Sequence, residues 1–265
     1  MVSFFKNIIK QVLLNQNICF YKNVSGNELL EVIKLFKPYN VGHKLVRIGG
    51  NNDGGYLVPD VLNDVEYCFS AGVGEQSSFE VDLLARNIKS FLADYSVNFI
   101  SKNKDLKFDK KFIKSYNSNN SWNVNDWINN KIPDLNEKDF ILQMDIEGGE
   151  YEVINAITEE NLRKMKILII EFHSLEYSGN PLIYNMIKSS MKKLLKYFDI
   201  CHIHPNNWKK VTKVNNYNFP SNLEVTLINK KNVITKNPIN FLPNSLDRKN
   251  VKNKNDIKLD EYWYK

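Results

Sequence analysis

From Val65 onward, short apolar segments alternate with amphipathic ones, and this alternation constrains the fold more than any other feature of the sequence. Strands that alternate with helices are typical of an α/β protein with a doubly wound, mostly parallel sheet and helices on both faces. A chain of 265 residues suffices for one such domain. The predicted strands are Val65–Ser70, Ser90–Asp94, Phe140–Asp145, Lys166–His173, Ile200–His204 and Asn222–Lys230, and the predicted helices are Ser77–Asn87, Glu150–Met165 and Asn180–Phe198.

The segment before this alternation is predicted to be mainly helical. Met1–Phe20 and Gly26–Lys37 each have apolar residues at helical spacing. Lys44–Pro59 has two apolar stretches around a Gly/Asn/Asp cluster, which is typical of a hairpin or a tight loop. The first helix has no cleavage site of a signal peptide. It either packs on the body of the protein or makes a membrane-surface or dimer contact.

The tail after Phe241 is charged and has no periodicity, and we expect it to be irregular. Tyr262, Trp263 and Tyr264 are the residues expected to hold it down. The chain thus divides into an N-terminal helical segment (1–42) that packs on the core or on a dimer partner, a main domain (43–241) and an irregular tail (242–265).

The cysteines and the apolar runs indicate the compartment. Cys19, Cys68 and Cys201 lie far apart without C-x-x-C spacing, which favours a reducing, cytoplasmic location and excludes a zinc knuckle. No apolar run reaches the ~18 residues that a membrane span needs. We therefore predict no transmembrane segment.

The net charge of +6 invites a nucleic-acid interpretation, but the type of charge argues against it. Only 4 of the 36 basic residues are Arg, the residue on which base and phosphate recognition depends most. AT-rich codon usage explains the lysines equally well. Between Tyr177 and Val214 there are seven lysines and one acid, Asp199. They form either a solvated surface or a region that attracts an anionic substrate.

The turn Gly72-Val73-Gly74 follows the first predicted strand and precedes a helix. Such a turn lets the backbone approach a ligand closely, although a plain strand-to-helix turn has the same residues. The third glycine of a dinucleotide fingerprint is missing, and Glu75 would repel a pyrophosphate. Asp94 ends the next strand 20 residues beyond Gly74, where an acid binds ribose hydroxyls in nucleotide sites.

Acids and histidines gather at the predicted carboxyl ends of the later strands. Asp145 ends one strand, Glu171 and His173 end the next, and His204 ends another, with His202 two residues before it. Ligands of open α/β sheets bind at this edge, so these side chains are predicted to form a site in which a histidine acts as general base or carboxylates and histidines hold a metal. The alternative is that each is structural. Glu150 and Glu152 have another structural explanation, because acids in the first turn of a helix complement its dipole.

Together these motifs resemble the FkbM-type S-adenosylmethionine-dependent methyltransferases. The resemblance extends over Val46–Lys230 and rests most on MDIEGGEYEV, DGGYLV and HIHPNN. It implies a Rossmann-like, seven-stranded sheet whose last strand, Asn222–Lys230, is antiparallel. It also implies methylation of a hydroxyl, often on the sugars of polysaccharides. The chain departs from the family in the Glu and Gln that follow Gly-Val-Gly.

The resemblance also implies roles for individual residues. Gly72, Val73, Gly74 and Glu75 would border the methionine and ribose of S-adenosylmethionine, Asp94 would reach the ribose or adenosine end, and Asp53 and Tyr56 would lie near the pocket mouth. Asp145, Glu171 and His173 are expected around the acceptor, with His204 second to them. As some sugar methyltransferases hold a divalent cation at these strand ends, Asp145, Glu171 and His173 form a candidate site for Mg²⁺ or Mn²⁺.

These observations predict a methyltransferase whose substrate is a small carbohydrate, either anionic or linked to a nucleotide. Two rival hypotheses remain. One is a nicotinamide-dependent oxidoreductase on a similar fold, which the missing glycine and Glu75 disfavour. The other is a basic, non-enzymatic binding module for nucleic acid or membrane, which the low Arg content and the strand-end acids disfavour.

Overall fold

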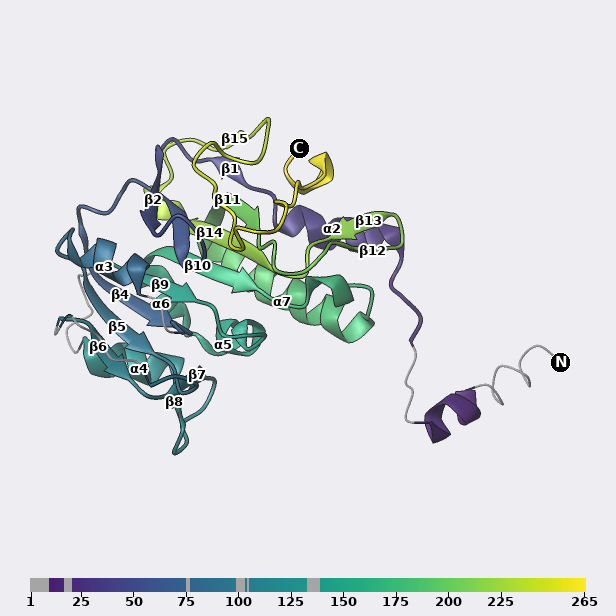
Figure 1. Cartoon of the computed structure of the whole chain (residues 1–265), viewed down its shortest axis with the longest axis horizontal. Coiled ribbons are helices and arrows are strands. Elements are labelled where there is room, and N and C mark those ends of the chain that lie inside the picture. Colours follow the sequence, from purple (N-terminus) through teal and green to yellow (C-terminus); the bar gives the residue numbers. More distant parts are fainter. Residues whose placement is uncertain (1–9, 17–20, 75–76, 99–102, 104, 133–138) are drawn as a thin grey trace.

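The computed structural model describes residues 10–16, 21–74, 77–98, 103, 105–132 and 139–265 (Figure 1). Its centre is a seven-stranded sheet of order β11-β14-β10-β9-β4-β5-β6. All neighbouring pairs are parallel except those of β14, which runs antiparallel to both β10 and β11. The strands are β4 (Val65–Ala71), β5 (Lys89–Ala93), β6 (Lys107–Asp109), β9 (Asp139–Met144), β10 (Met165–Phe172), β11 (Phe198–Pro205) and β14 (Leu223–Asn229).

The sheet confirms the predicted mostly parallel α/β class and the antiparallel last strand. β6 is the one member of the sheet that the sequence patterns did not predict, because three residues are too few to show a periodicity. Paired small strands accompany the sheet: β1 (Tyr39–Asn40) with β15 (Asn237–Pro238), β2 (Leu45–Gly49) with β3 (Gly55–Pro59), β7 (Phe112–Lys114) with β8 (Ser121–Asn123), and β12 (Thr212–Val214) with β13 (Tyr217–Phe219). The pair β2–β3 is the predicted hairpin.

One predicted helix is two helices. The expected segment Glu150–Met165 divides into α5 (Glu150–Ala156) and α6 (Glu159–Lys164). The break falls at Thr158, whose side chain accepts a hydrogen bond from the backbone N–H of Asn161 and so caps a new helix. The other helices are α2 (Gly26–Leu35), α3 (Ser78–Leu84), α4 (Val124–Lys131) and α7 (Pro181–Tyr197).

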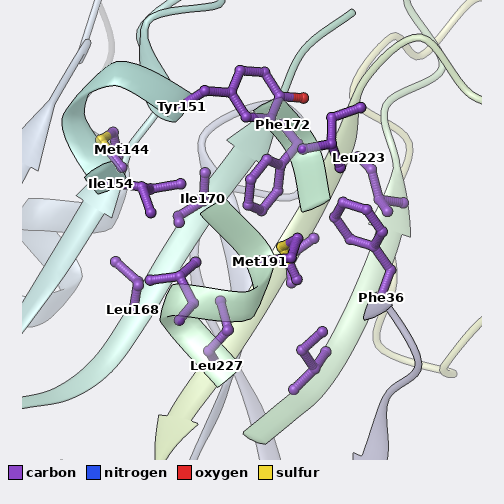
Figure 2. Close-up of a cluster of buried hydrophobic side chains, with 14 of the residues drawn as sticks. Phe36, Met144, Tyr151, Ile154, Leu168, Ile170, Phe172, Met191, Leu223 and Leu227 are labelled. Carbon is purple, nitrogen blue, oxygen red and sulfur yellow. The ribbon is translucent and has the colours of Figure 1, made fainter. Parts of the chain in front are cut away.

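Strand β10 shows how both faces of the sheet are buried. Leu168, Ile170 and Phe172 belong to a core shared with α2, α4, α5 and α7, and Figure 2 shows part of this core. Ile167 and Ile169 point to the opposite face and pack in a smaller core with α3 and the β2–β3 hairpin. Because alternate residues of a strand face opposite ways, a strand covered on both faces is apolar throughout.

The C-terminal tail packs near α2 (Figure 1). Ser25 and Glu28 form a capping box at its N-terminus. In the tail, Trp263 is fully buried, and its ring packs 5.5 Å from that of Phe219 and 6.1 Å from that of Phe36, measured between centroids. Residues 10–15 are helical, whereas the rest of the predicted Met1–Phe20 helix lies outside the described residues.

Among the described helices, none combines the length and the apolar character that crossing a membrane requires.

The turn after β4 depends on a glycine without a side chain. Gly72 has φ +79°, and a Cβ atom there would lie 1.6 Å from the carbonyl oxygen of Asp145. Gly74 also has a positive φ, +55°, but a Cβ there would meet nothing within 4 Å. A substitution at either glycine would therefore strain the backbone, but only a substitution at Gly72 would also cause a steric clash.

We predict that Gly72→Ala lowers the free energy of unfolding by about 2–5 kcal/mol, because overpacking of about 1–3 kcal/mol adds to a left-handed backbone cost of about 1–2 kcal/mol. Gly74→Ala, the control, should lose only the backbone cost. Urea denaturation of both variants measures the difference. Equal losses would show that the close approach to Asp145 is not a constraint.

Candidate functional site

The glycine turn is fixed by backbone and carboxylate contacts. The N–H of Gly72 donates to the carbonyl of Ala93 at 2.9 Å, and the N–H of Asp145 donates to the carbonyl of Ala71 at 2.9 Å. The N–H of Gly74 donates to Oδ2 of Asp94 at 3.0 Å. The carboxyl ends of β4, β5 and β9 are thereby held together at one point.

Asp94 is buried at the end of β5 and links the turn to the next loop. Its Oδ1 accepts hydrogen bonds from the backbone N–H of Ser96 at 2.8 Å and from its hydroxyl at 2.7 Å. These bonds fix the carboxylate beside the glycine turn. A carboxylate oxygen can accept more than one bond, so Asp94 also remains an acceptor for a ligand.

Two adjoining cavities open over this turn, and together they form a cleft along the carboxyl edge of the sheet. The first, of about 290 Å³, lies between the β2–β3 hairpin and the turn. The second, of about 320 Å³, has an apolar wall of Ala93, Phe112, Ile113 and Ile146. Both are lined by Gly72, Asp94, Ser96, Asp145 and Glu147.

The cleft is acidic. The described residues that line it include Asp53, Glu80, Asp94, Asp145 and Glu147, whereas Lys114 is the one basic residue among them. Closely spaced carboxylates attract a cation and oppose a diphosphate. The cleft therefore suits a ligand with positive charge, a sugar-like middle and an apolar end.

Beside the cleft, four ionisable residues lie in a row across the sheet. Glu171 on β10 pairs with Glu224 on β14, and Glu224 pairs with His204 on β11. Asp145 directly follows Met144, which pairs with Ile170. Residues opposite each other on neighbouring strands point to the same face, so the row presents three carboxylates and one imidazole.

His173 connects the acids at the end of β9 and β10. Its Nδ1 lies 3.0 Å from Oε1 of Glu150 and its Nε2 lies 3.6 Å from Oδ1 of Asp145. Glu150 is completely buried, and its Oε1 also accepts hydrogen bonds from the N–H groups of Ile146 and Gly148, both at 3.1 Å. Glu150 thus orients His173 and shapes the turn after Asp145.

The charges of this group depend on one another. Burial raises the pKa of Glu171 to about 7, and the charge of Glu224 adds to the effect. Burial and the charge of Glu171 also raise the pKa of Asp145 well above its usual range. For His173 burial alone would lower the pKa, but the hydrogen bond to Glu150 and the nearby carboxylates outweigh it and raise the pKa to about 9. His173 is therefore protonated at neutral pH.

The comparisons with known proteins agree with the predicted resemblance. The family model described as Methyltransferase FkbM domain matches residues 123–201, a segment that contains Asp145, Glu171 and His173. Over these residues the chain is similar to the FkbM methyltransferases. The match confirms the resemblance that the sequence motifs indicated and supports methyl transfer as the class of activity.

No curated protein matches the chain. Among solved structures 12 chains match. One of them is "The crystal structure of a putative hemolysin from Lactococcus lactis", which is 10% identical, covers 79% of this chain and 89% of its own length, and has a TM-score of 0.29. At that similarity the match supports no inference about fold or activity.

The predicted cofactor residues lie around the cleft. Gly72, Val73, Gly74, Asp94, Asp53 and Tyr56 all line its first cavity. The hydroxyl of Tyr56 accepts a hydrogen bond from Nε2 of Gln143 at 3.2 Å. Glu75 lies outside the described residues.

The predicted acceptor residues are only partly brought together. Asp145, Glu171 and His173 form one cluster, in which the possible ligand atoms lie within 4.8 Å of one another. His204 lies farther along the row and is buried, with its ring nitrogens 3.5 Å from Glu224 and 3.6 Å from Asp256. It does not line the cleft.

The cluster has the donor atoms of a divalent cation site. Oxygen ligands with one imidazole suit Mg²⁺ or Mn²⁺. Oδ1 of Asp145 is buried without a hydrogen-bond partner, as is expected of an oxygen that binds a ligand. A second group of possible ligands, Asp53, Glu171 and Glu224, shares Glu171 with the first.

Sequence reasoning missed several polar residues of the site. Glu80 and Gln143 lie at the first cavity, and the hydroxyl of Ser70 hydrogen-bonds to both side chains. The amide of Asn222 donates to Glu171 at 2.7 Å, alongside that of Asn206 from the HIHPNN motif at 3.1 Å. A signal was present only for Gln143, because it is polar in an otherwise apolar predicted strand.

The lysines of α7 are not near the cleft. α7 ends at Tyr197 where β11 begins, so its last turns, with Lys192 and Lys196, lie at the amino edge of the sheet. Lys188 forms an ion pair with Glu31 at 2.9 Å. The lysines of α7 therefore cannot attract an anionic substrate to the cleft, as the sequence analysis had allowed.

Glu80 provides a test of how strongly the cleft disfavours buried charge. Burial raises its pKa from 4.5 to about 6, although the hydrogen bond with Ser70 opposes this. A raised carboxyl pKa means that the folded state loses stability as the pH rises from about 4.5 to about 6. We predict that Glu80→Gln relieves this cost of about 2 kcal/mol.

The stability gain of Glu80→Gln over the native chain should appear above pH 6 and vanish below pH 4.5. Chemical denaturation across this pH range, without ligand, measures it. A difference that does not change with pH would contradict the assignment of a buried, titrating Glu80.

Proposed function

We propose that the chain is an S-adenosylmethionine-dependent O-methyltransferase that acts on a hydroxyl of a carbohydrate, such as a sugar of a surface polysaccharide. The observation that carries the proposal is the acidic cleft across the Gly72–Gly74 turn, in a chain whose residues 123–201 match the FkbM methyltransferase domain. The proposal includes a doubly wound fold with N-terminal helices, the division into residues 1–42, 43–241 and 242–265, and a cytoplasmic location. Among the described cysteines, Cys68 and Cys201 are free, in keeping with that location.

The two halves of the cleft match the two ends of S-adenosylmethionine. Its ammonium and sulfonium groups are positive, and the acidic first cavity with Asp53, Asp145 and Glu147 suits them. Its adenine is flat and largely apolar, and the second cavity offers Phe112 and Ile113. Asp94 lines both cavities and lies between them as a partner for the ribose hydroxyls. The diphosphate of a nicotinamide cofactor would face the same acids.

For methyl transfer the protein must orient the acceptor hydroxyl and remove its proton. S-adenosylmethionine, when bound, supplies a methyl group that is already activated by the positive sulfur. Asp145 and Glu171 are the candidate proton acceptors, and the pKa of Glu171, about 7, suits this work at neutral pH. His173 is protonated there, so we assign it the role of orienting Asp145.

A divalent cation on Asp145, Glu171 and His173 is the alternative means of activating the hydroxyl. It would lower the pKa of a bound hydroxyl. The donor set and the unpartnered Oδ1 of Asp145 support it, and His173 would bind the cation as a neutral imidazole, after giving up its proton.

Trp208 supports a carbohydrate as the acceptor. Its side chain is 59% exposed, and it lies two residues after Asn206, whose amide contacts Glu171. The face of an aromatic ring carries partial negative charge and attracts the polarised C–H groups of a sugar ring. An exposed indole two residues from an amide that contacts the acidic cluster is therefore suited to stack against the sugar ring of the acceptor.

Titration calorimetry with S-adenosylhomocysteine tests the cofactor. We predict that the native chain binds it and does not bind NAD, and that Asp94→Ala raises the Kd at least tenfold because the turn loses its carboxylate and the ribose its partner. Asp60→Ala, an exposed acid after β3, is the control and should bind normally. Binding of NAD instead of S-adenosylhomocysteine would favour the oxidoreductase hypothesis.

Binding of Mn²⁺, measured by calorimetry in the same protein, tests the metal alternative. The cluster predicts one site, weakened at least tenfold by Asp145→Asn because a neutral amide is a poorer ligand than a carboxylate. Asp60→Asn is the matched control. Equal affinity of Asp145→Asn and the native chain for Mn²⁺, or no binding at all, would contradict the metal hypothesis.

A further inference from the structure

The tail residues Asp247 to Asp256, called the strap below, lie against the carboxyl end of β11 and the amino end of β14, and Figure 1 draws this segment in yellow. Oδ1 of Asp247 lies 2.8 Å from Nε2 of His202. The side-chain amide of Asn207 donates to the carbonyl of Val251 at 3.0 Å and accepts from its N–H at 2.8 Å. The strap is therefore fixed to the sheet by side chains of the His-x-His strand and its following loop.

Asn250 connects the strap to the cleft. Only 7% of it is exposed, and its Nδ2 donates to Oδ1 of Asp53 at 3.1 Å and to Oε1 of Glu224 at 2.6 Å. Asp53 lines the first cavity of the cleft, and Glu224 belongs to the ionisable row. The strap thus forms part of the wall beside the reacting centre.

Three cations of the strap surround a further cavity of about 360 Å³. Arg248, Lys249 and Lys252 line it, together with Asn51 of the hairpin turn, Asp247 and Asp256. Each of the two acids contacts a histidine, Asp247 with His202 and Asp256 with His204. Within the described part of the chain, no carboxylate forms an ion pair with Lys249 or Lys252.

The charge of this cavity is opposite to that of the cleft. Asn51 of the basic cavity and Asp53 of the acidic cleft are two residues apart, so both cavities reach the hairpin turn. Burial alone would lower the pKa of His204, but its bonds to Asp256 and Glu224 raise it to about 10. The imidazolium offsets Asp256, so the cavity keeps three cations, Arg248, Lys249 and Lys252, against the one carboxylate of Asp247.

We propose that this cavity binds the phosphate or diphosphate of the acceptor, so that the substrate is a phosphorylated or nucleotide-linked sugar. The inference rests on the proposed function, because it needs a sugar whose hydroxyl reaches Asp145 and Glu171. Lysine and arginine form strong, charge-assisted hydrogen bonds with phosphate oxygens. The sugar ring then lies between the basic cavity and the acidic cluster.

Trp208 fits this placement. Nζ of Lys254, within the strap, lies 4.2 Å from the centroid of the indole ring and also donates to the Trp208 carbonyl. The aromatic platform and the basic cavity are thus joined by one segment. The acceptor would contact both while its hydroxyl faces the acids.

Calorimetric titration with pyrophosphate and with UDP-glucose, as probes of the phosphate group, tests the proposal. We expect the native chain to bind pyrophosphate, and Lys249→Gln with Lys252→Gln to raise the Kd at least tenfold. Lys192→Gln with Lys196→Gln removes the same charge from the far edge of the sheet and should leave the Kd unchanged. All four lysines are surface residues, and thermal unfolding checks that both variants remain folded.

Equal pyrophosphate binding by the strap variant and the native chain would overturn the proposal, and so would equal losses in both variants or no binding at all. Tight binding of UDP-glucose that the strap variant does not weaken would also overturn it. S-adenosylhomocysteine is titrated in parallel and tests the proposed function by itself. Pyrophosphate binding that depends on the strap, without S-adenosylhomocysteine binding, would leave the anion site standing and remove the methyltransferase assignment.

Discussion

The close approach of Gly72 to the carbonyl of Asp145 is the constraint on which the rest of the site depends. A side chain at position 72 would fall 1.6 Å from that oxygen, so the ends of β4 and β9 can meet only at a glycine. Their meeting lets Asp94 bind the N–H of Gly74 from β5. The cleft exists because three parallel strands end at one place without side chains between them.

Charge then divides the carboxyl edge of the sheet into two regions. Acids that follow β5 and β9, one acid of α3 and one of the hairpin turn make the cleft negative, and the strap brings Arg248, Lys249 and Lys252 to its border. Neighbouring polar groups offset the desolvation cost of the buried acids. Asparagine amides donate hydrogen bonds to Glu171, and His173 faces Asp145. A positively charged methyl donor and an anionic acceptor would thus be attracted to adjacent places.

The sheet and the position of the site could be predicted because they follow from local patterns. Apolar runs marked the main strands, and polar residues at their ends marked the binding edge. The strap could not be predicted, because Asp247 and Asp256 meet His202 and His204 only through contacts 45 and 52 residues apart in the chain. The excess of lysines was assigned to the segment Tyr177–Val214, of which Lys192 and Lys196 lie on α7 at the opposite edge of the sheet. The break between α5 and α6 was hidden by continuous helical periodicity across Thr158.

The proposed function depends on how a cofactor lies in the cleft. A crystal structure of the chain with bound S-adenosylhomocysteine measures this most directly. We predict the adenine against Phe112 and Ile113, the ribose at Asp94, and the sulfur above Gly72 and facing Asp145. A ligand bound elsewhere, or one whose adenine occupies the acidic cavity beside Asp53, would contradict the account.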